Sequence, residues 1–197
     1  GSLVAIAQRD VKRMLAYSSI AHAGFLLTGV IALNKAGLEA TLFYLFAYGI
    51  TTVGAFAIVT LVRDSAGEVT DLNRWKGLGK RSPWVATAFA GFLLSFAGIP
   101  LTSGFIGKFS IFSAAYESGA TSVVIAGVLS SAIAAFFYIR VIVLMFFTDP
   151  VEDGTSVEIP SSLTSITVIF SMIVTIALGV FPAPVLTFIS NLATFIR

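Results

Sequence analysis

The chain has 197 residues, of which 57% are hydrophobic and only 11% are charged, with a formal charge of +2. This composition is far more apolar than that of a soluble domain, so we expect a protein surrounded by the lipid bilayer, with no nucleic-acid partner because its basic residues form no stripe. Cysteine is absent and there is a single histidine, which excludes disulfides and iron–sulfur clusters in this chain and argues against a histidine-rich metal site.

Apolar stretches of helix length follow one another along the chain. Residues 1–7 read as the end of an apolar helix whose beginning is missing. A helix needs roughly 20 apolar residues to cross a membrane, and the stretches at about 11–33, 38–62, 83–116, 121–147 and 163–181 meet this requirement. After Pro182, a weakly amphipathic tail is expected. We therefore predict an all-α fold in which residues 1–197 form a single transmembrane domain of about five helices.

Basic residues fall mainly on one side of these spans. Those assigned to this side are Arg9, Lys12, Arg13, Arg63, Arg74, Lys76, Lys80, Arg81 and Arg140. Only Lys35 and Arg197 fall on the other side. The positive-inside rule then predicts a cytoplasmic start and a periplasmic or external end. Trp75 and Trp84 flank the third span and are expected in the aromatic belts at its ends.

The third span is too long to be one straight helix. At about 1.5 Å per residue, its roughly 34 residues would extend about 50 Å. Gly98, Pro100 and Gly104 lie in the middle, where proline removes a backbone donor and glycine tolerates unusual dihedral angles. We predict a broken helix with halves at about 83–97 and 105–116.

Lys108 is the strongest candidate for a functional residue. A charge inside an apolar span costs roughly 2.5–3.5 kcal/mol on the mildest scale. The predicted start near Phe105 places Lys108 in the first turn of the second half-helix, where the helix dipole opposes a cation. Carbonyl groups freed at the end of the first half-helix could stabilise the charged form in return. We interpret Lys108 as a residue that gains and loses a proton; a lysine that only snorkels or forms a structural ion pair is the alternative.

Two polar stripes accompany this lysine on the first and second spans. The first stripe contains Lys12, Ser18, Ser19 and His22. The second contains Tyr44, Tyr48, Thr51 and Thr52. Facing stripes could hold a file of water, and His22 suits a proton relay because free imidazole titrates near neutrality. The alternatives are hydrogen bonds between helices for the tyrosines and threonines, and a membrane-boundary anchor for Lys12.

The fourth span carries a face of small residues. Gly127, Ser131 and Ala135 are spaced by four and predict close helix packing. Arg140 lies about two turns from the end of this span, and we interpret it as mostly structural.

Two motifs resemble a known family. Residues 12–22, KRMLAYSSIAH, and 97–109, AGIPLTSGFIGKF, are similar to the antiporter-like membrane subunits of respiratory complex I. With FYIRV at 137–141, the chain looks most like subunit N of bacterial NADH:quinone oxidoreductase. The resemblance implies the C-terminal half of an inverted-repeat fold in a bacterial plasma membrane. It also implies that Lys108 and His22 transfer protons, and Lys12 lies in the first motif as a further candidate for proton transfer.

The implied activity is proton translocation by one subunit of a larger redox-driven translocase. Other membrane subunits would be its partners, and NADH, flavin, iron–sulfur clusters and quinone would bind elsewhere, leaving this chain without a cofactor. A subunit of a multisubunit Na⁺/H⁺ antiporter and a non-catalytic membrane scaffold are the alternative functions.

Overall fold

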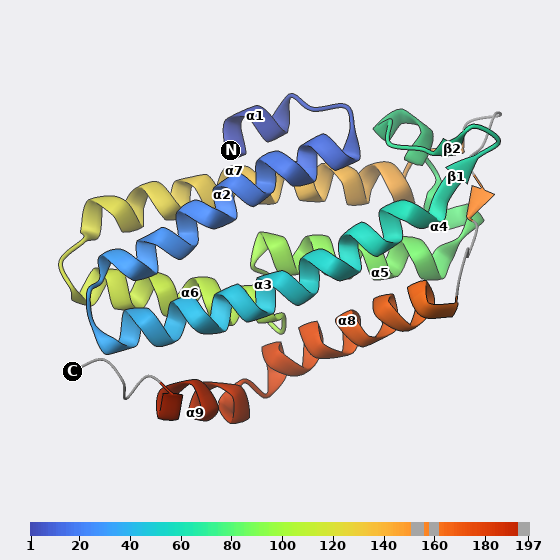
Figure 1. Ribbon diagram of the computed structural model, residues 1–197. Coiled ribbons are helices and arrows are strands. Elements are labelled where there is room, and N and C mark those ends of the chain that lie inside the picture. Colours follow the sequence, from blue (N-terminus) through green and yellow to red (C-terminus); the bar gives the residue numbers. More distant parts are fainter. Residues whose placement is uncertain (151–155, 158–161, 193–197) are drawn as a thin grey trace.

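The computed structural model describes residues 1–150, 156–157 and 162–192 as a bundle of helices with a small sheet at one end (Figure 1). The helices are α1 (Ser2–Ile6), α2 (Val11–Ile31), α3 (Lys35–Leu61), α4 (Leu78–Arg81), α5 (Pro83–Ala97), α6 (Ser103–Glu117), α7 (Thr121–Phe146), α8 (Ser162–Val180) and α9 (Ala183–Leu192), with a 3₁₀ helix η1 (Leu72–Trp75). The strands are β1 (Val62–Asp64), β2 (Gly67–Glu68) and β3 (Ser156–Val157).

Long apolar helices dominate the bundle. Among the described residues, α2, α3, α7 and α8 are each long and apolar enough to cross a membrane. The shorter α5 and α6 follow each other across a break, as predicted for the third span. Large apolar side chains such as Leu27 of α2 and Ile173 of α8 are exposed on the outside of the bundle. This surface fits lipid, and it confirms an all-α membrane bundle with an interrupted third span.

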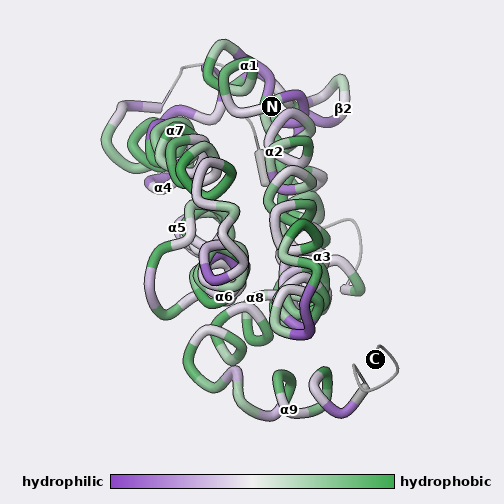
Figure 2. Tube along the Cα trace, turned by 90° about the vertical axis from the view of Figure 1, so that its left-hand side faces the viewer, coloured by the Kyte–Doolittle hydropathy of each residue, from purple (hydrophilic) through white to green (hydrophobic). Residues whose placement is uncertain are grey.

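Helix α3 packs against α2, α5, α6 and α8. Viewed along the bundle, α5, α6 and α7 lie on one side and α2 and α3 on the other, with α8 and α9 beside them (Figure 2). The apolar side chains Phe43 and Ala47 of α3 contact Leu178 of α8 and Ile189 of α9. The predicted tail thus forms a short helix against the bundle, up to residue 192.

Capping side chains explain where two of the helices begin. Asp10 accepts a hydrogen bond from the backbone N–H of Arg13 at 2.8 Å and starts α2. Asn34 accepts from the N–H of Gly37 at 2.7 Å, so α3 begins at Lys35 rather than near residue 38.

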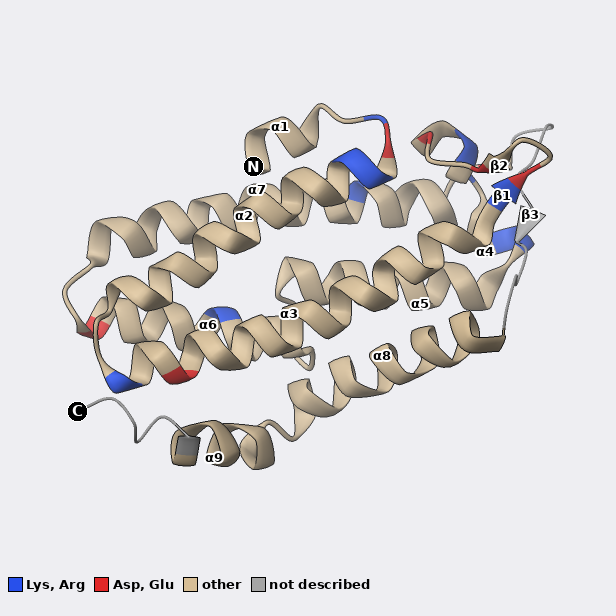
Figure 3. Cartoon of the chain, viewed as in Figure 1, with Lys and Arg blue, Asp and Glu red and all other residues tan. Residues whose placement is uncertain are grey.

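A three-stranded antiparallel sheet closes one end of the bundle, where the sequence indicated only a polar loop. Its strand order is β2-β1-β3, with Arg63 opposite Glu68 and Val62 opposite Val157. Most Lys and Arg residues of the described chain gather at this end, around β1, β2 and α4 (Figure 3). The N-terminal end of α2 is attached here, since the Val11 N–H donates to the Thr70 carbonyl at 2.7 Å.

Trp75 does not occupy an aromatic belt. Its side chain is fully buried and its indole N–H donates to the Val69 carbonyl at 2.8 Å. The ring lies 5.1 Å from that of Phe89 of α5. The belt prediction for Trp75 is therefore wrong, because the loop folds back over the indole. Trp84 is 44% exposed, as expected for a belt residue.

Candidate functional site

The break in the third span is built from unusual backbone conformations. Helix α5 ends at Ala97 and is capped by Gly98, whose φ of +82° lies in the left-handed region, and Leu101 has a φ of +72°. Glycine adopts this conformation without a steric penalty. Pro100 follows within the turn and cannot continue the hydrogen bonds of α5. The predicted break at Gly98 and Pro100 is present.

Helix α6 begins alongside the end of α5, and Gly104 allows this approach. A Cβ at Gly104 would lie 1.8 Å from the carbonyl oxygen of Ser95. The Ser95 hydroxyl accepts from the free Gly104 N–H at 3.2 Å. This hydrogen bond satisfies one of the unpaired amide groups at the start of α6. The close packing explains why α6 begins at Ser103, two residues before the predicted Phe105.

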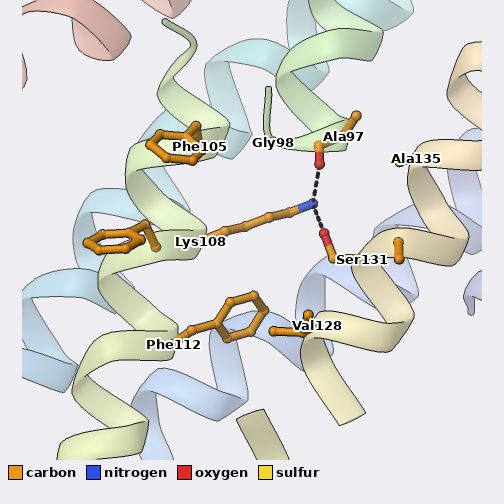
Figure 4. Close-up of a pocket in the computed structure, with 10 residues that line it drawn as sticks. Ala97, Gly98, Phe105, Lys108, Phe112, Val128, Ser131 and Ala135 are labelled. Atoms are coloured by element: carbon orange, nitrogen blue, oxygen red, sulfur yellow. Dashed lines mark hydrogen bonds between the residues drawn. The ribbon is translucent and has the colours of Figure 1, made fainter. Parts of the chain in front are cut away.

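The Lys108 side chain crosses from α6 to the end of α5 and to α7 (Figure 4). Its ammonium group donates to the carbonyls of Phe96 at 2.6 Å and Ala97 at 3.4 Å, and to the Ser131 hydroxyl at 2.9 Å. In a continuous helix, the Phe96 carbonyl would accept from the N–H of Pro100, which proline lacks. The break therefore creates the acceptor that Lys108 uses.

This geometry changes the predicted electrostatics of Lys108. The residue lies in the second turn of α6 rather than the first, because α6 begins at Ser103. Its ammonium group sits at the C-terminal end of α5, where the helix dipole stabilises a cation. The side chain is only 5% exposed, and its Nζ lies 4.9 Å from the centre of the Phe25 ring. The dipole argument from the sequence was thus wrong in sign at the ammonium group, whereas the predicted carbonyl stabilisation is present.

An apolar cavity of about 310 Å³ adjoins Lys108 between α6 and α7. Phe105 and Phe112 of α6 and Val128 and Ala135 of α7 contribute to its walls (Figure 4). The ammonium group thus has three polar acceptors on one side and an apolar surrounding on the other. Such a site can hold the lysine charged or neutral.

A second polar cluster surrounds His22 of α2. Its ring nitrogens Nδ1 and Nε2 lie 2.5 Å from the Tyr44 hydroxyl and 3.1 Å from the Tyr138 hydroxyl, respectively. The Tyr138 hydroxyl is also hydrogen-bonded to Ser18. The Tyr48 ring stacks on the imidazole with the centroids 4.4 Å apart. His22, Tyr44 and Tyr138 are each at most 1% exposed, so the cluster is isolated from bulk solvent.

Two phenylalanines join the lysine and the histidine clusters. The Phe96 ring lies 5.5 Å from the His22 ring, and the same residue provides the carbonyl for Lys108. The Phe25 ring also lies 5.5 Å from His22 and contacts the ammonium group. Lys108 and His22 are thus neighbours separated by apolar rings.

Some predicted site residues join these clusters and others do not. Tyr48 donates to the Ser19 hydroxyl at 2.7 Å, so the polar stripes meet at this level. The Thr51 hydroxyl instead lies 3.1 Å from the Thr175 hydroxyl of α8. The Thr52 hydroxyl is buried and has no hydrogen-bond partner among the residues that the structure describes. Thr51 therefore does not line a stripe that faces α2, and its contact with α8 is the hydrogen bond between helices that was the alternative for this residue.

Lys12 lies apart from both clusters. It forms an ion pair with Glu68 of β2 at the charged end of the bundle, and its side chain is 42% exposed. This placement favours the anchoring role over a role in proton transfer. Arg140 is structural in the described chain, since it donates to the Ile6 carbonyl of α1 at 3.0 Å.

Two site residues escaped the sequence analysis. Ser131, interpreted as a packing residue, accepts from Lys108, and Tyr138 contacts His22. Both lie on α7, and the small-residue spacing around Ser131 indicated only that this face approaches another helix.

Comparison with known proteins identifies the family. A model of the membrane family described as "NADH:quinone oxidoreductase/Mrp antiporter, TM" matches residues 1–134. The chain belongs to this family. Subunit N of the NADH-quinone oxidoreductase of Rhodococcus opacus is 59% identical over 197 residues, and subunit N 3 of Streptomyces griseus is 60% identical over the same length. The chain spans 36% of the length of each of these relatives.

Two solved structures have the same fold as this chain. A chain of respiratory complex I from Thermus thermophilus is 32% identical with a TM-score of 0.82, and the match covers 94% of this chain and 42% of that one. A chain of the Mrp complex from Dietzia sp. has a TM-score of 0.83 over 98% of this chain and 44% of that one. At 22% identity, this second likeness concerns the fold alone.

Proposed function

We propose that this chain is part of a proton-translocating membrane subunit of NADH:quinone oxidoreductase, in which Lys108 gains and loses the transported proton. The observation that carries the proposal is a buried ammonium group held by carbonyls that the break in the third span leaves free. A buried charge with three ligands and an adjoining cavity can switch its protonation state when the local hydration or charge changes.

The relatives support this function over the antiporter alternative. Both are consistent with the family description, but the relatives sharing about 60% identity are named as NADH-quinone oxidoreductase subunits. In this proposal the chain works with other membrane subunits of the complex. NADH, flavin, iron–sulfur clusters and quinone would bind to other subunits. The sequence has no cysteine to hold an iron–sulfur cluster, and the lysine and the histidine–tyrosine cluster of this chain would serve proton transfer.

The proposed orientation follows the charge distribution. The basic end around β1, β2 and α4 faces the cytoplasm of a bacterial cell, in agreement with the positive-inside rule. The loop between α6 and α7 then faces the outside.

Lys108→Met in the full-length subunit, assembled in its complex, tests the function. Methionine preserves most of the apolar volume but carries no proton, so we expect proton translocation driven by NADH oxidation to fall about tenfold or more. Lys35→Met is the matched control, because Lys35 is an exposed lysine paired with Glu39. The two variants are compared in inverted membrane vesicles by the quenching of a pH-sensitive dye.

Each outcome bears on one function. Full translocation by an assembled Lys108→Met complex would leave only the scaffold function. Sodium transport by the wild type in antiporter-deficient cells, independent of NADH, would favour the antiporter.

A further inference from the structure

The two ring nitrogens of His22 each meet a tyrosine hydroxyl from a different helix. Tyr44 of α3 lies at Nδ1 and Tyr138 of α7 lies at Nε2, at 2.5 Å and 3.1 Å. Neither tyrosine hydroxyl is exposed, and the Tyr138 hydroxyl continues to the buried Ser18 hydroxyl. A hydrogen-bonded chain of four groups, Tyr44–His22–Tyr138–Ser18, therefore crosses the interior between α3 and α7.

Because of the chemistry of imidazole, the two hydrogen bonds of His22 in this four-group chain must point the same way along it. A neutral imidazole carries one N–H donor and one acceptor nitrogen, so it cannot donate to both tyrosines or accept from both. One tyrosine must donate to His22 while the other accepts from it. A tyrosine hydroxyl can do either, because it has both a proton and lone pairs.

We propose that Tyr44 and Tyr138 are the proton-transfer partners of His22, and that a proton crosses the ring by exchange of its tautomers. This inference rests on the proposed function. When a proton reaches the Tyr44 oxygen, the original Tyr44 proton moves to Nδ1, and the Nε2 proton moves to the Tyr138 oxygen. The original Tyr138 proton then passes to the Ser18 oxygen, and Ser18 releases its own hydroxyl proton to a water molecule. One proton enters at Tyr44 and one leaves at Ser18, and all four groups stay neutral.

The packing holds these groups in line. The Tyr48 ring stacks on the imidazole at an interplanar angle of 17° and keeps the plane of the ring fixed. Tyr44 lies against Gly107 of α6, where an added Cβ would be 2.3 Å from the tyrosine ring. Because Gly107 directly precedes Lys108, the position of α6 sets the position of Tyr44 as well as that of the lysine.

The test compares Tyr44→Phe, Tyr138→Phe and the double variant in the full-length subunit of the assembled complex. Phenylalanine preserves the ring and removes the hydroxyl. We expect each single variant to lower proton translocation about tenfold or more, because each removes one proton-transfer group. The double variant should be no slower than the slower single variant, because the two hydroxyls act in series. Tyr116→Phe is the matched control, since Tyr116 is an exposed tyrosine of α6.

The outcomes separate this inference from the proposed function. Losses that multiply in the double variant would mean that the hydroxyls act independently, as packing groups do, and would overturn the relay. Translocation at the Tyr116→Phe rate in both single variants would also overturn it, while a loss in Lys108→Met would leave the proposed function standing. The amount of assembled complex, measured on native gels, shows that each variant folds.

Discussion

Gly98 is the residue on which the geometry of the break depends most directly. Its φ is +82°, and a Cβ at this position would lie 3.2 Å from Cδ of Lys108. Gly98→Ala should destabilise the subunit by about 1–2 kcal/mol, the cost of a left-handed residue with a Cβ, and should also displace the lysine. Thermal unfolding in detergent and proton translocation measure the two effects. Gly24→Ala is the control, because a Cβ there meets no atom within 4 Å. Equal effects of both substitutions would contradict this account.

Whether a site residue could be predicted from the sequence depends on whether its role is set within one helix or by the packing of two helices. Lys108 could be predicted because a charge in an apolar span is costly, and the break could be predicted from Gly98 and Pro100. The ligand Ser131 and the contact of Tyr138 with His22 could not. A hydroxyl is common in a membrane helix, and its partner depends on how α7 is rotated against α2 and α6.

At the scale of elements, the membrane spans can be predicted from the length of the apolar stretches, but the helices that pack against each span cannot. Thr51 shares a helical face with Tyr44 and Tyr48, and yet it contacts α8, because α3 is surrounded by several helices. Strand β1 pairs with β3, which is far away in the sequence and too short to have its own pattern. Such strand pairing is determined by a segment far away in the sequence rather than by the local sequence of β1.

The sheet end of the bundle should weaken in acid. Asp64 of β1 binds Arg74 of η1 and accepts from the Ala66 N–H at 2.7 Å. The hydrogen bond from Arg74, followed by that from Ala66, lowers the pKa of Asp64 below its usual value. Because the pKa of Asp64 is lower in the folded chain than in the unfolded chain, ionised Asp64 stabilises the fold at pH values above its unfolded pKa of about 3.9. This stabilisation is lost as the pH falls through the pKa of Asp64 in the folded chain. Protection of the backbone amides of residues 62–76 from hydrogen–deuterium exchange, relative to the intrinsic exchange rate at each pH, should therefore decrease below about pH 4.

Asp64→Asn provides the comparison for this acid effect. The variant lacks the titrating carboxylate, so its protection should be lower at neutral pH and should change less between neutral pH and acid. Asp149→Asn is the matched control. Asp149 also forms an ion pair, with Lys80, but the Asp149 side chain is 93% exposed. An undiminished acid transition in Asp64→Asn would assign the effect to another group.

At the scale of the whole molecule, the charges are separated along the bundle. Lys and Arg residues gather around β1, β2 and α4, while the spans between carry few charges (Figure 3). A bundle of this kind has a preferred orientation, because each basic residue near a helix end opposes transfer across the membrane. The proposed orientation can therefore be tested independently of transport.

Cysteines introduced at the two ends should react from opposite sides of the membrane. Asn73 of η1 and Ser118 after α6 are both exposed. The segment after β2, which contains η1, and the loop between α6 and α7 lie at opposite ends of the bundle (Figure 1). In a full-length subunit otherwise free of cysteine, Ser118→Cys should react with a membrane-impermeant maleimide in intact cells. Asn73→Cys should react only in inverted vesicles, because the positive-inside rule holds its end in the cytoplasm. The reverse labelling pattern would place the basic end outside and would contradict the proposed orientation. The end of the bundle with the loop between α6 and α7 would then face the cytoplasm, and cytoplasmic protons would approach Lys108 from that end.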